Sequence, residues 1–241
     1  MVVAVLCAMT CLVPRFVESR DAAAADEVET ALQLVTLLNL SRTLVSEHQA
    51  EINDPTKGNK GFTPAFVGET LTTRFRNQEH IDLSRPDGTS KGAILRSLLE
   101  SQKEVVASYQ VVINRSGIGF KGFPPTLFTR KVGEQFFEKT GIKLKSIGAD
   151  YRFPGNKPDD FEAEILRMFM DSRHRKGQPY GRNMLVAGKQ TLRLMQPEYA
   201  TASCLWCHGS PKGERDITGT RKEGWKEGEL AGAISVTMPL R

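Results

Sequence analysis

Five consecutive residues carry the clearest chemistry in the sequence: Cys204, Leu205, Trp206, Cys207 and His208. Two cysteines at this spacing can form thioether bonds to both vinyl groups of a haem, and the histidine that follows can bind the haem iron through its imidazole. This pattern is the sequence signal for c-type haem attachment. It predicts one covalent haem c per chain, held by Cys204 and Cys207, with His208 as the proximal iron ligand.

Three other roles of the cysteine pair compete with haem attachment. A structural zinc site needs further Cys or His ligands, but Cys7 and Cys11 lie near the N-terminus and the remaining histidines are scattered. A thioredoxin-like pair opens a helix within a βαβ unit, whereas this pair precedes a Gly/Pro-containing loop near the C-terminus. A disulfide is typical of exported proteins. Haem attachment is the interpretation we favour.

The N-terminal segment indicates export. Residues 2–13 form an apolar run that is too short to span a bilayer comfortably, and an alanine run follows at 22–25. We predict a signal peptide over residues 1–25, cleaved near Ala24 or Ala25, and therefore a periplasmic or extracytoplasmic protein. The run lacks a positively charged start, so retention as a membrane anchor is the alternative. After cleavage, the haem-binding cysteines would be the only ones left.

The overall composition is that of a globular protein. A chain of 241 residues can bury one sizeable core. The 33 Lys and Arg exceed the 28 Asp and Glu, which gives a formal net charge of +5. No Lys/Arg-rich run with interleaved aromatic residues occurs, so nucleic acid is not an expected partner. The basic excess suits a solvated surface or a docking face for an acidic redox partner.

Two long amphipathic helices are expected in the N-terminal half, over residues 27–53 and 93–114, where apolar side chains recur at helical spacing. Each leads into a loop with glycine, phenylalanine and proline. These two segments form an internal repeat with a constant offset of 61 residues, as from Gln49 to Gln110. The repeat aligns His48 with Tyr109 and predicts a paired helix-plus-loop unit, whose loops we interpret as structural.

The C-terminal half is expected to form a small antiparallel sheet around the haem motif. The pattern predicts helices at 128–139 and 158–173, and strands at 142–147, 183–187, 191–195 and 230–238. The fold class is therefore α+β, a small sheet with long N-terminal helices. We expect one domain over residues 26–241, with a helical part at 26–140 and a sheet part at 141–241.

Several motifs together resemble the PAS-like c-type haem sensor family, which includes a cyanobacterial single-haem protein and extracytoplasmic domains of bacterial sensor kinases and chemoreceptors. The resemblance is carried by CLWCHG at 204–209, KGERD at 212–216, GELAGAISV at 228–236, NKPDDFE at 156–162 and the repeated Gln-x-x-Ile-Asn and Lys-Gly-Phe-x-Pro elements. It implies a PAS-like sheet, covalent haem at Cys204 and Cys207, His208 as proximal ligand, and a sensing role.

The distal iron ligand is open. In the cyanobacterial member of the family it is a cysteine from a helix, and the mature chain has no third cysteine. His48 is our first candidate, because it lies on the apolar stripe of the first helix and a second imidazole would give a low-spin centre. An open or water-bound iron is an alternative. Further candidates, which more often serve packing, are Tyr109, Met168, Met170, Met184 and Met195. His80 and His174 are expected at the surface.

Other residues near the motif have supporting roles. Arg152, Arg182 and Arg193 flank the expected pocket, and one of them could pair with a haem propionate. Ordinary solvated surface is the alternative for all three. Trp206 and Trp225 are expected to cover the porphyrin from solvent.

The expected function is that of an exported single-haem protein that senses redox state or a small ligand. A change at the iron would shift the long helices and pass to a separate redox or signalling partner. The alternative is a periplasmic electron-transfer cytochrome or a haem subunit of a larger redox complex. A haem enzyme ranks last, because no distal His-Arg pattern is present. The N-terminal helices could also join two chains in a homodimer.

Overall fold

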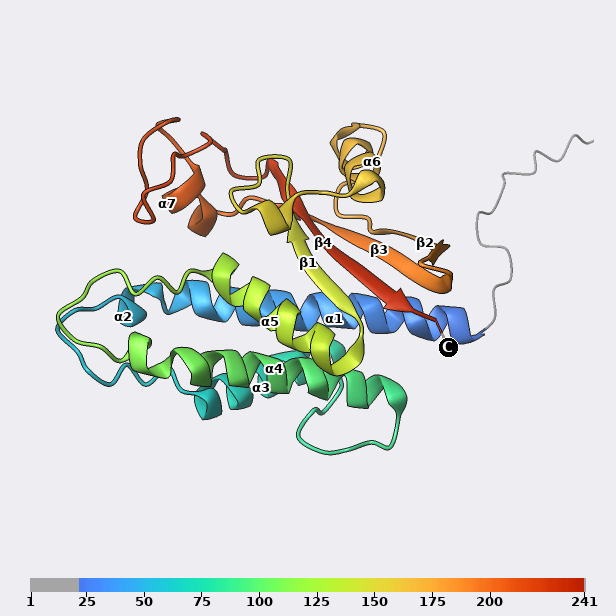
Figure 1. Cartoon of the computed structure of the whole chain (residues 1–241), viewed down its shortest axis with the longest axis horizontal. Helices are drawn as coiled ribbons and strands as arrows, with labels where there is room; N and C mark the ends of the chain where they lie inside the picture. The colour runs from blue at the N-terminus through green and yellow to red at the C-terminus, as the bar shows by residue number, and fades with distance from the viewer. Residues whose placement is uncertain (1–21, 241) are drawn as a thin grey trace, which may run out of the picture.

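The chain folds into a layer of long helices that covers one face of a small antiparallel sheet (Figure 1). A computed structural model describes residues 22–240. Most of the predicted signal peptide, with Cys7 and Cys11, lies outside the described residues. Within them, none of the helices has the length and apolar character needed to cross a membrane.

The helical layer contains five helices in chain order: α1 (Ala22–Glu47), α2 (Gln49–Ile52), α3 (Pro64–Glu79), α4 (Ser90–Ile113) and α5 (Pro125–Thr140). Helix α3 begins where the side chain of Thr63 accepts a hydrogen bond from the backbone N–H of Phe66, 3.1 Å away. Thr89 caps α4 in the same way. A Thr followed by proline in the first helical turn is a standard helix start, yet the sequence pattern did not lead us to predict α3.

The expectation of one unbroken helix over residues 27–53 was wrong at His48. Helix α1 ends at Glu47 and α2 begins at Gln49, with His48 as a turn residue between them. The imidazole Nδ1 of His48 lies 2.9 Å from the carbonyl oxygen of Leu44. The amide of Gln49 similarly donates to Val45. Side chains that bond to carbonyls of the preceding turn compete with the regular helical ladder.

The internal repeat folds into two units that hold each other by matching contacts. The side-chain amide of Gln49 donates to the carbonyl of Phe123 at 3.1 Å, and Gln110 donates to the carbonyl of Phe62 at 3.3 Å. Likewise, the backbone N–H of Lys60 bonds to Asn114, and that of Lys121 bonds to Asn53. Every donor and acceptor has its counterpart 61 residues away, so the repeated motifs serve to clamp the two loops together.

The sheet has the strand order β1-β4-β3-β2, with all neighbours antiparallel. Its strands are β1 (Lys143–Ile147), β2 (Tyr180–Val186), β3 (Lys189–Tyr199) and β4 (Leu230–Pro239). Side chains alternate between its faces: Leu194 and Val236 join the main core under the helices, whereas Met195 and Ala233 pack beneath α6 (Asp160–Met170) on the other face. The predicted α+β class is confirmed; the likeness to a PAS sheet remains a prediction.

Close packing of α5 on β1 depends on Gly133. A Cβ atom at this position would lie 2.5 Å from the carbonyl oxygen of Leu144, which is too close unless the backbone moves. We expect Gly133→Ala to lower the free energy of unfolding by about 1 kcal/mol, because strain from overpacking exceeds the gain in helix propensity. Chemical denaturation measures this. Gly119→Ala is the control, since nothing lies within 4 Å of its Cβ position; an equal loss in both variants would contradict the packing argument.

Candidate functional site

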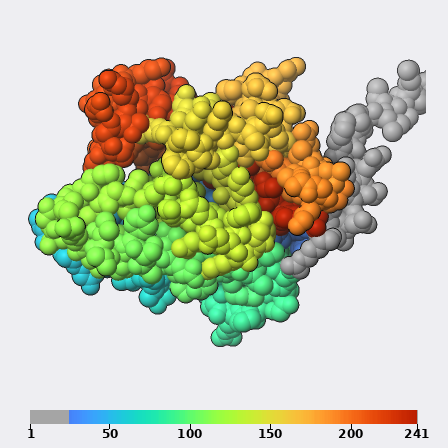
Figure 2. All heavy atoms as spheres, in the orientation of Figure 1, coloured from blue at the N-terminus to red at the C-terminus, as the bar shows by residue number. Residues whose placement is uncertain are grey.

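The CxxCH motif lies on a long segment, residues 200–229, between the two central strands β3 and β4. The cysteines and histidine are carried by a short 3-10 turn (Ala202–Cys204) and by α7 (Leu205–His208). Backbone hydrogen bonds of 2.8 Å from Ala200 to Glu229 and from Gly228 to Ala200 close the segment at its base. It projects above the helical layer in the space-filling view (Figure 2). The core of the sheet therefore fixes both ends of the motif-bearing segment.

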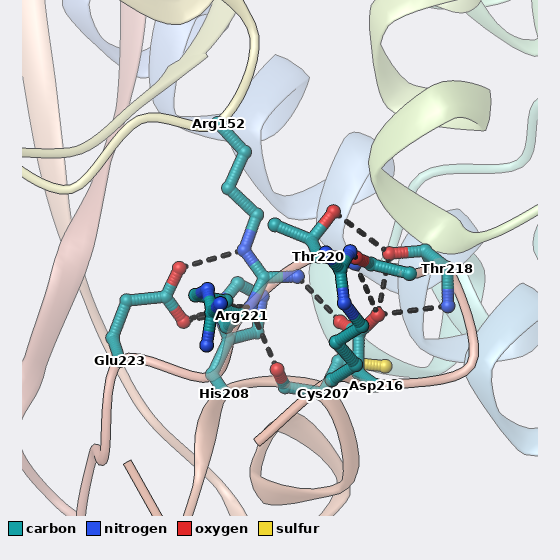
Figure 3. Close-up of polar contacts among 10 residues, drawn as sticks. Arg152, Cys207, His208, Asp216, Thr218, Thr220, Arg221 and Glu223 are labelled. Atoms are coloured by element: carbon teal, nitrogen blue, oxygen red, sulfur yellow. Dashed lines mark hydrogen bonds and ion pairs between the residues drawn. The ribbon is translucent and has the colours of Figure 1, made fainter. Parts of the chain in front are cut away.

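His208 is held by four contacts from the stretch Glu223–Trp225. Its Nδ1 lies 2.8 Å from Oε2 of Glu223 (Figure 3). Its carbonyl oxygen accepts hydrogen bonds from the backbone N–H groups of Gly224 and Trp225. The indole of Trp225 stacks on the imidazole, with ring centroids 4.2 Å apart and an interplanar angle of 10°. Because an ionised carboxylate only accepts hydrogen bonds, Nδ1 carries the proton, which leaves the lone pair of Nε2 available for a metal.

Arg152 joins this histidine to the rest of the segment (Figure 3). Its guanidinium donates to both carboxylate oxygens of Glu223, at 2.6 and 2.7 Å, and to Oδ2 of Asp216 at 2.6 Å. It also donates to the carbonyl oxygen of Cys207 at 2.7 Å. A planar fork with several donors suits such multiple contacts. One side chain thus fixes the haem motif, the carboxylate behind His208 and the loop that carries Asp216.

Burial and hydrogen bonding shift three pKa values in this network. Burial, reinforced by the charge of Arg152, lowers the pKa of His208, so the neutral imidazole is favoured. Burial alone would raise the pKa of Glu223, but hydrogen bonds from Arg152 and His208 outweigh it and hold the pKa below its ordinary value. For Asp216, contacts from Thr218 and Arg152 likewise outweigh burial and lower the pKa. The site is thus organised around a neutral histidine and two ionised carboxylates.

These shifts predict acid lability of the haem-free protein. A folded-state pKa of His208 below 6.5 means that the unfolded chain binds more protons as pH falls below that value, so stability declines. Glu223 and Asp216 contribute stability that is present above their unfolded values of 4.5 and 3.8 and is lost as pH falls through their lower folded values. Melting temperatures recorded from pH 7 to pH 3 should fall in both windows. Asp216→Asn should flatten the more acidic one; an unchanged profile in this variant would contradict the assignment.

Both cysteines of the motif are unpaired and half-buried. The sulfur of Cys204 lies 3.5 Å from the backbone nitrogen and 3.4 Å from the hydroxyl of Thr201. Burial, with the nearby charge of Asp216, raises the pKa of Cys207, which keeps it as a thiol. Two free thiols beside an imidazole whose Nε2 has no hydrogen-bond partner among the described residues form a donor set that fits a covalently attached haem.

The described contacts of His48 lie elsewhere than at the CxxCH motif. Its ring packs between Phe62 and Phe66, with centroid distances of 5.4 and 5.2 Å. Its Nε2 lies 3.9 Å from a carboxylate oxygen of Glu51. None of the polar or aromatic contacts of His48 within residues 22–240 involves residues 204–208. Distal iron ligation by His48 stays a prediction.

The other distal candidates are spread over the molecule. The ring of Tyr109 packs at a tilt against that of Phe123 within the repeat, with centroids 4.9 Å apart. Met195 is fully buried beneath α6, with Met168 and Met184 packed around the same cluster, whereas Met170 is exposed. The exposed His80 ends α3 in a left-handed conformation, as expected for a surface residue. The half-buried His174 bonds through Nε2 to the carbonyl of Gln178.

The arginines and tryptophans that were expected near the motif take different roles. Arg152 is neither solvated nor free for a propionate, because it is bound to Glu223 and Asp216. Arg182 pairs with Glu164, and Arg193 pairs with Asp159. Trp225 lies on the His208 ring, whereas Trp206 is 83% exposed. Sequence reasoning missed Glu223 and included Asp216 only as the last residue of the KGERD element, without a role, since neither has a spacing to the motif that signals contact.

The chain is similar to a known protein family and to a solved structure. The family model described as Tll0287-like matches residues 20–239. Among solved structures, the chain is similar to the crystal structure of the cyanobacterial heme-protein Tll0287, with 18% sequence identity and a TM-score of 0.44. That alignment covers 66% of this chain and 98% of the other. A search of curated proteins finds no match.

Proposed function

The chain belongs to the Tll0287-like family, and we propose that it is an exported haem c protein that senses redox state or a small ligand. Cys204 and Cys207 would form the thioether bonds, and His208 would bind the iron. The haem, when bound, would supply one-electron and ligand-binding chemistry. The family shares its name with a cyanobacterial protein described as a heme-protein, which supports haem binding in this chain.

One observation carries the proposal: the hydrogen bond of 2.8 Å between Nδ1 of His208 and Glu223. Metal-binding histidines commonly donate their second N–H to a carboxylate, which fixes the tautomer and the direction of the ring. This arrangement is already built into the folded chain, next to two unpaired cysteines. A histidine with a merely structural role would not require the Nε2 lone pair to stay free.

A sensing role is supported by the connections from the motif to the helices. Strand β3 ends where the motif-bearing segment begins, strand β4 begins where it ends, and both strands pack on α1 through the main core. An open groove of about 420 Å³ lies at the surface between α1 and the end of β3, and a small ligand could bind there. Its polar wall includes Asn39, Arg42, Thr43, Glu198 and Tyr199. A change at the motif would thus reach the helices through packed strands rather than a flexible linker.

The electron-transfer alternative is favoured by a different observation. Trp206, inside the motif itself, is 83% exposed, so the edge of the site lies at the surface where a redox partner could dock. An electron carrier needs a solvent-near cofactor and stable ligation, but no conformational response. Binding of an acidic partner protein and dimerisation through the helices also stay predictions.

The deciding experiment is expression in the periplasm with a cytochrome c maturation system, followed by a haem-stained denaturing gel and optical spectra. We expect covalent haem in the wild type and none in the Cys204→Ala/Cys207→Ala variant. A shift of the reduced spectrum under CO would support a ligand sensor, and an inert spectrum would favour the carrier. If CO binds only after His48→Ala, then His48 is the distal ligand. Absence of covalent haem from the folded wild type would contradict the proposal.

A further inference from the structure

We propose that Glu223 is a positioning residue that fixes the Nδ1-protonated tautomer of His208 and lowers the reduction potential of the iron that His208 would hold. This inference rests on the proposed haem function. It concerns a residue outside the CxxCH motif, which no feature of the motif identifies.

The geometry places a carboxylate oxygen directly behind the ligand. Oε2 of Glu223 lies 2.8 Å from Nδ1 of His208, on the side of the ring opposite to the free Nε2. A carboxylate accepts this proton more strongly than a neutral carbonyl would, and so makes the imidazole a stronger electron donor. Stronger donation stabilises ferric over ferrous iron, since hydrogen bonding to the ligand is one of the means by which a protein sets a potential.

The contact is rigid because both partners are fixed from other sides. Arg152 donates to both carboxylate oxygens of Glu223, at 2.6 and 2.7 Å, so the carboxylate cannot turn away from the ring. Trp225 stacks flat on His208, which restrains rotation of the imidazole. The backbone N–H groups of Gly224 and Trp225 bind the His208 carbonyl and hold the two segments at a constant separation. The hydrogen bond is therefore preorganised before any group binds at Nε2.

The net charge of the hydrogen-bonded network also favours a lower reduction potential. Glu223 and Asp216 carry two negative charges, and both are bound to the single positive charge of Arg152. This hydrogen-bonded set thus has a net negative charge beside the ligand. The side chains are mostly shielded from water, with exposed fractions of 16% for Glu223 and 0% for Asp216. Shielding strengthens the interaction of this charge with the metal site.

The test is a potentiometric titration of haem-loaded wild type, Glu223→Gln and the control Glu227→Gln. Glu227 lies on the same segment, is exposed and has no hydrogen-bond or ion-pair partner among the described residues. Glutamine keeps the shape of Glu223 but is a weaker, neutral acceptor. We expect the ferrous-to-ferric ratio at a fixed ambient potential to rise at least tenfold in Glu223→Gln, a positive shift of about 59 mV for a one-electron couple. Glu223→Asp, which keeps the charge, should stay closer to wild type.

Equal potentials in Glu223→Gln, Glu227→Gln and wild type would overturn the inference while leaving the haem function intact. Absence of covalent haem from the wild type would contradict the proposed function instead. If Glu223→Gln takes up no haem, the inference is tested by the tautomer of His208 in the wild type. This tautomer is read by ¹⁵N NMR of the full-length haem-free chain. A proton on Nδ1 supports the assignment, and a proton on Nε2 overturns it.

Discussion

Replacing Arg152 with glutamine is expected to lower the free energy of unfolding by about 3 kcal/mol and to prevent efficient haem attachment. Removing one partner of a buried ion pair leaves the other charge without compensation, which costs far more than the pair itself contributes. Loss of the Arg152 guanidinium would leave two carboxylates, those of Glu223 and the fully buried Asp216, without their positively charged partner. The carbonyl of Cys207 would also lose its hydrogen bond from Arg152. The segment that holds His208 would lose its central contact.

Thermal and urea unfolding of the haem-free protein measure the stability loss, and the haem-stained gel measures attachment. Arg173→Gln is the matched control, because Arg173 also forms an ion pair, with Asp171, but its side chain is 88% exposed. Exposed pairs contribute roughly 0 to 1 kcal/mol, so this variant should behave as wild type. If the two variants are equally stable, Arg152 does not organise the site.

Much of the fold follows from local signals in the sequence. The helical spacing in residues 93–114 became α4 (Ser90–Ile113), and the alternation in 142–147 became β1 (Lys143–Ile147). Prediction failed where local signals compete or depend on tertiary contacts. His48 interrupts the first helix through a contact to the turn before it. Strand β3 extends to Tyr199, beyond the predicted 191–195, because it pairs with β4 along its length.

Of the candidate site, too, one part could be predicted from the sequence and another part could not. Cys204, Cys207 and His208 could be found from the sequence, because covalent haem attachment imposes a fixed spacing on adjacent residues. Arg152 and Glu223 lie 71 residues apart, and their contact depends on how the loop after β1 meets the segment before β4. No periodicity or motif encodes such a meeting. The repeat, by contrast, was visible in the sequence, but its reciprocal hydrogen bonds required the folded structure.

An ion pair between Arg42 and Glu198 connects the helical layer to the strand that enters the motif. Arg42 of α1 forms two hydrogen bonds of 2.5 Å with the carboxylate of Glu198, near the end of β3 and six residues before Cys204. Burial disfavours the guanidinium charge, but Glu198 outweighs this effect and raises the pKa of Arg42. The pair also lines the open groove between α1 and β3. A bidentate pair at this point makes the position of the motif-bearing strand dependent on α1.

We expect Arg42→Leu to lower the free energy of unfolding by about 2 kcal/mol, because Glu198 would be left mostly buried without its partner. The double variant Arg42→Leu/Glu198→Leu should recover most of this loss, since two apolar side chains avoid the unpaired charge. Arg74→Leu is the control: its pair with Glu47 joins α3 to α1 but is more exposed than the Arg42–Glu198 pair, and its loss should stay below about 1 kcal/mol. Urea unfolding of wild type, Arg42→Leu, Glu198→Leu and the double variant gives the coupling energy.

The same variants separate stability from signalling. If the sensor proposal holds, reduction of the haem in wild type should change hydrogen exchange in α1, because Arg42 and Glu198 connect this helix to the strand that enters the motif. The double variant keeps the fold but lacks the bidentate contact, so α1 should exchange equally in the oxidised and reduced states. A response in α1 that persists undiminished in the double variant would show that the signal reaches the helices through the apolar core and not through this ion pair.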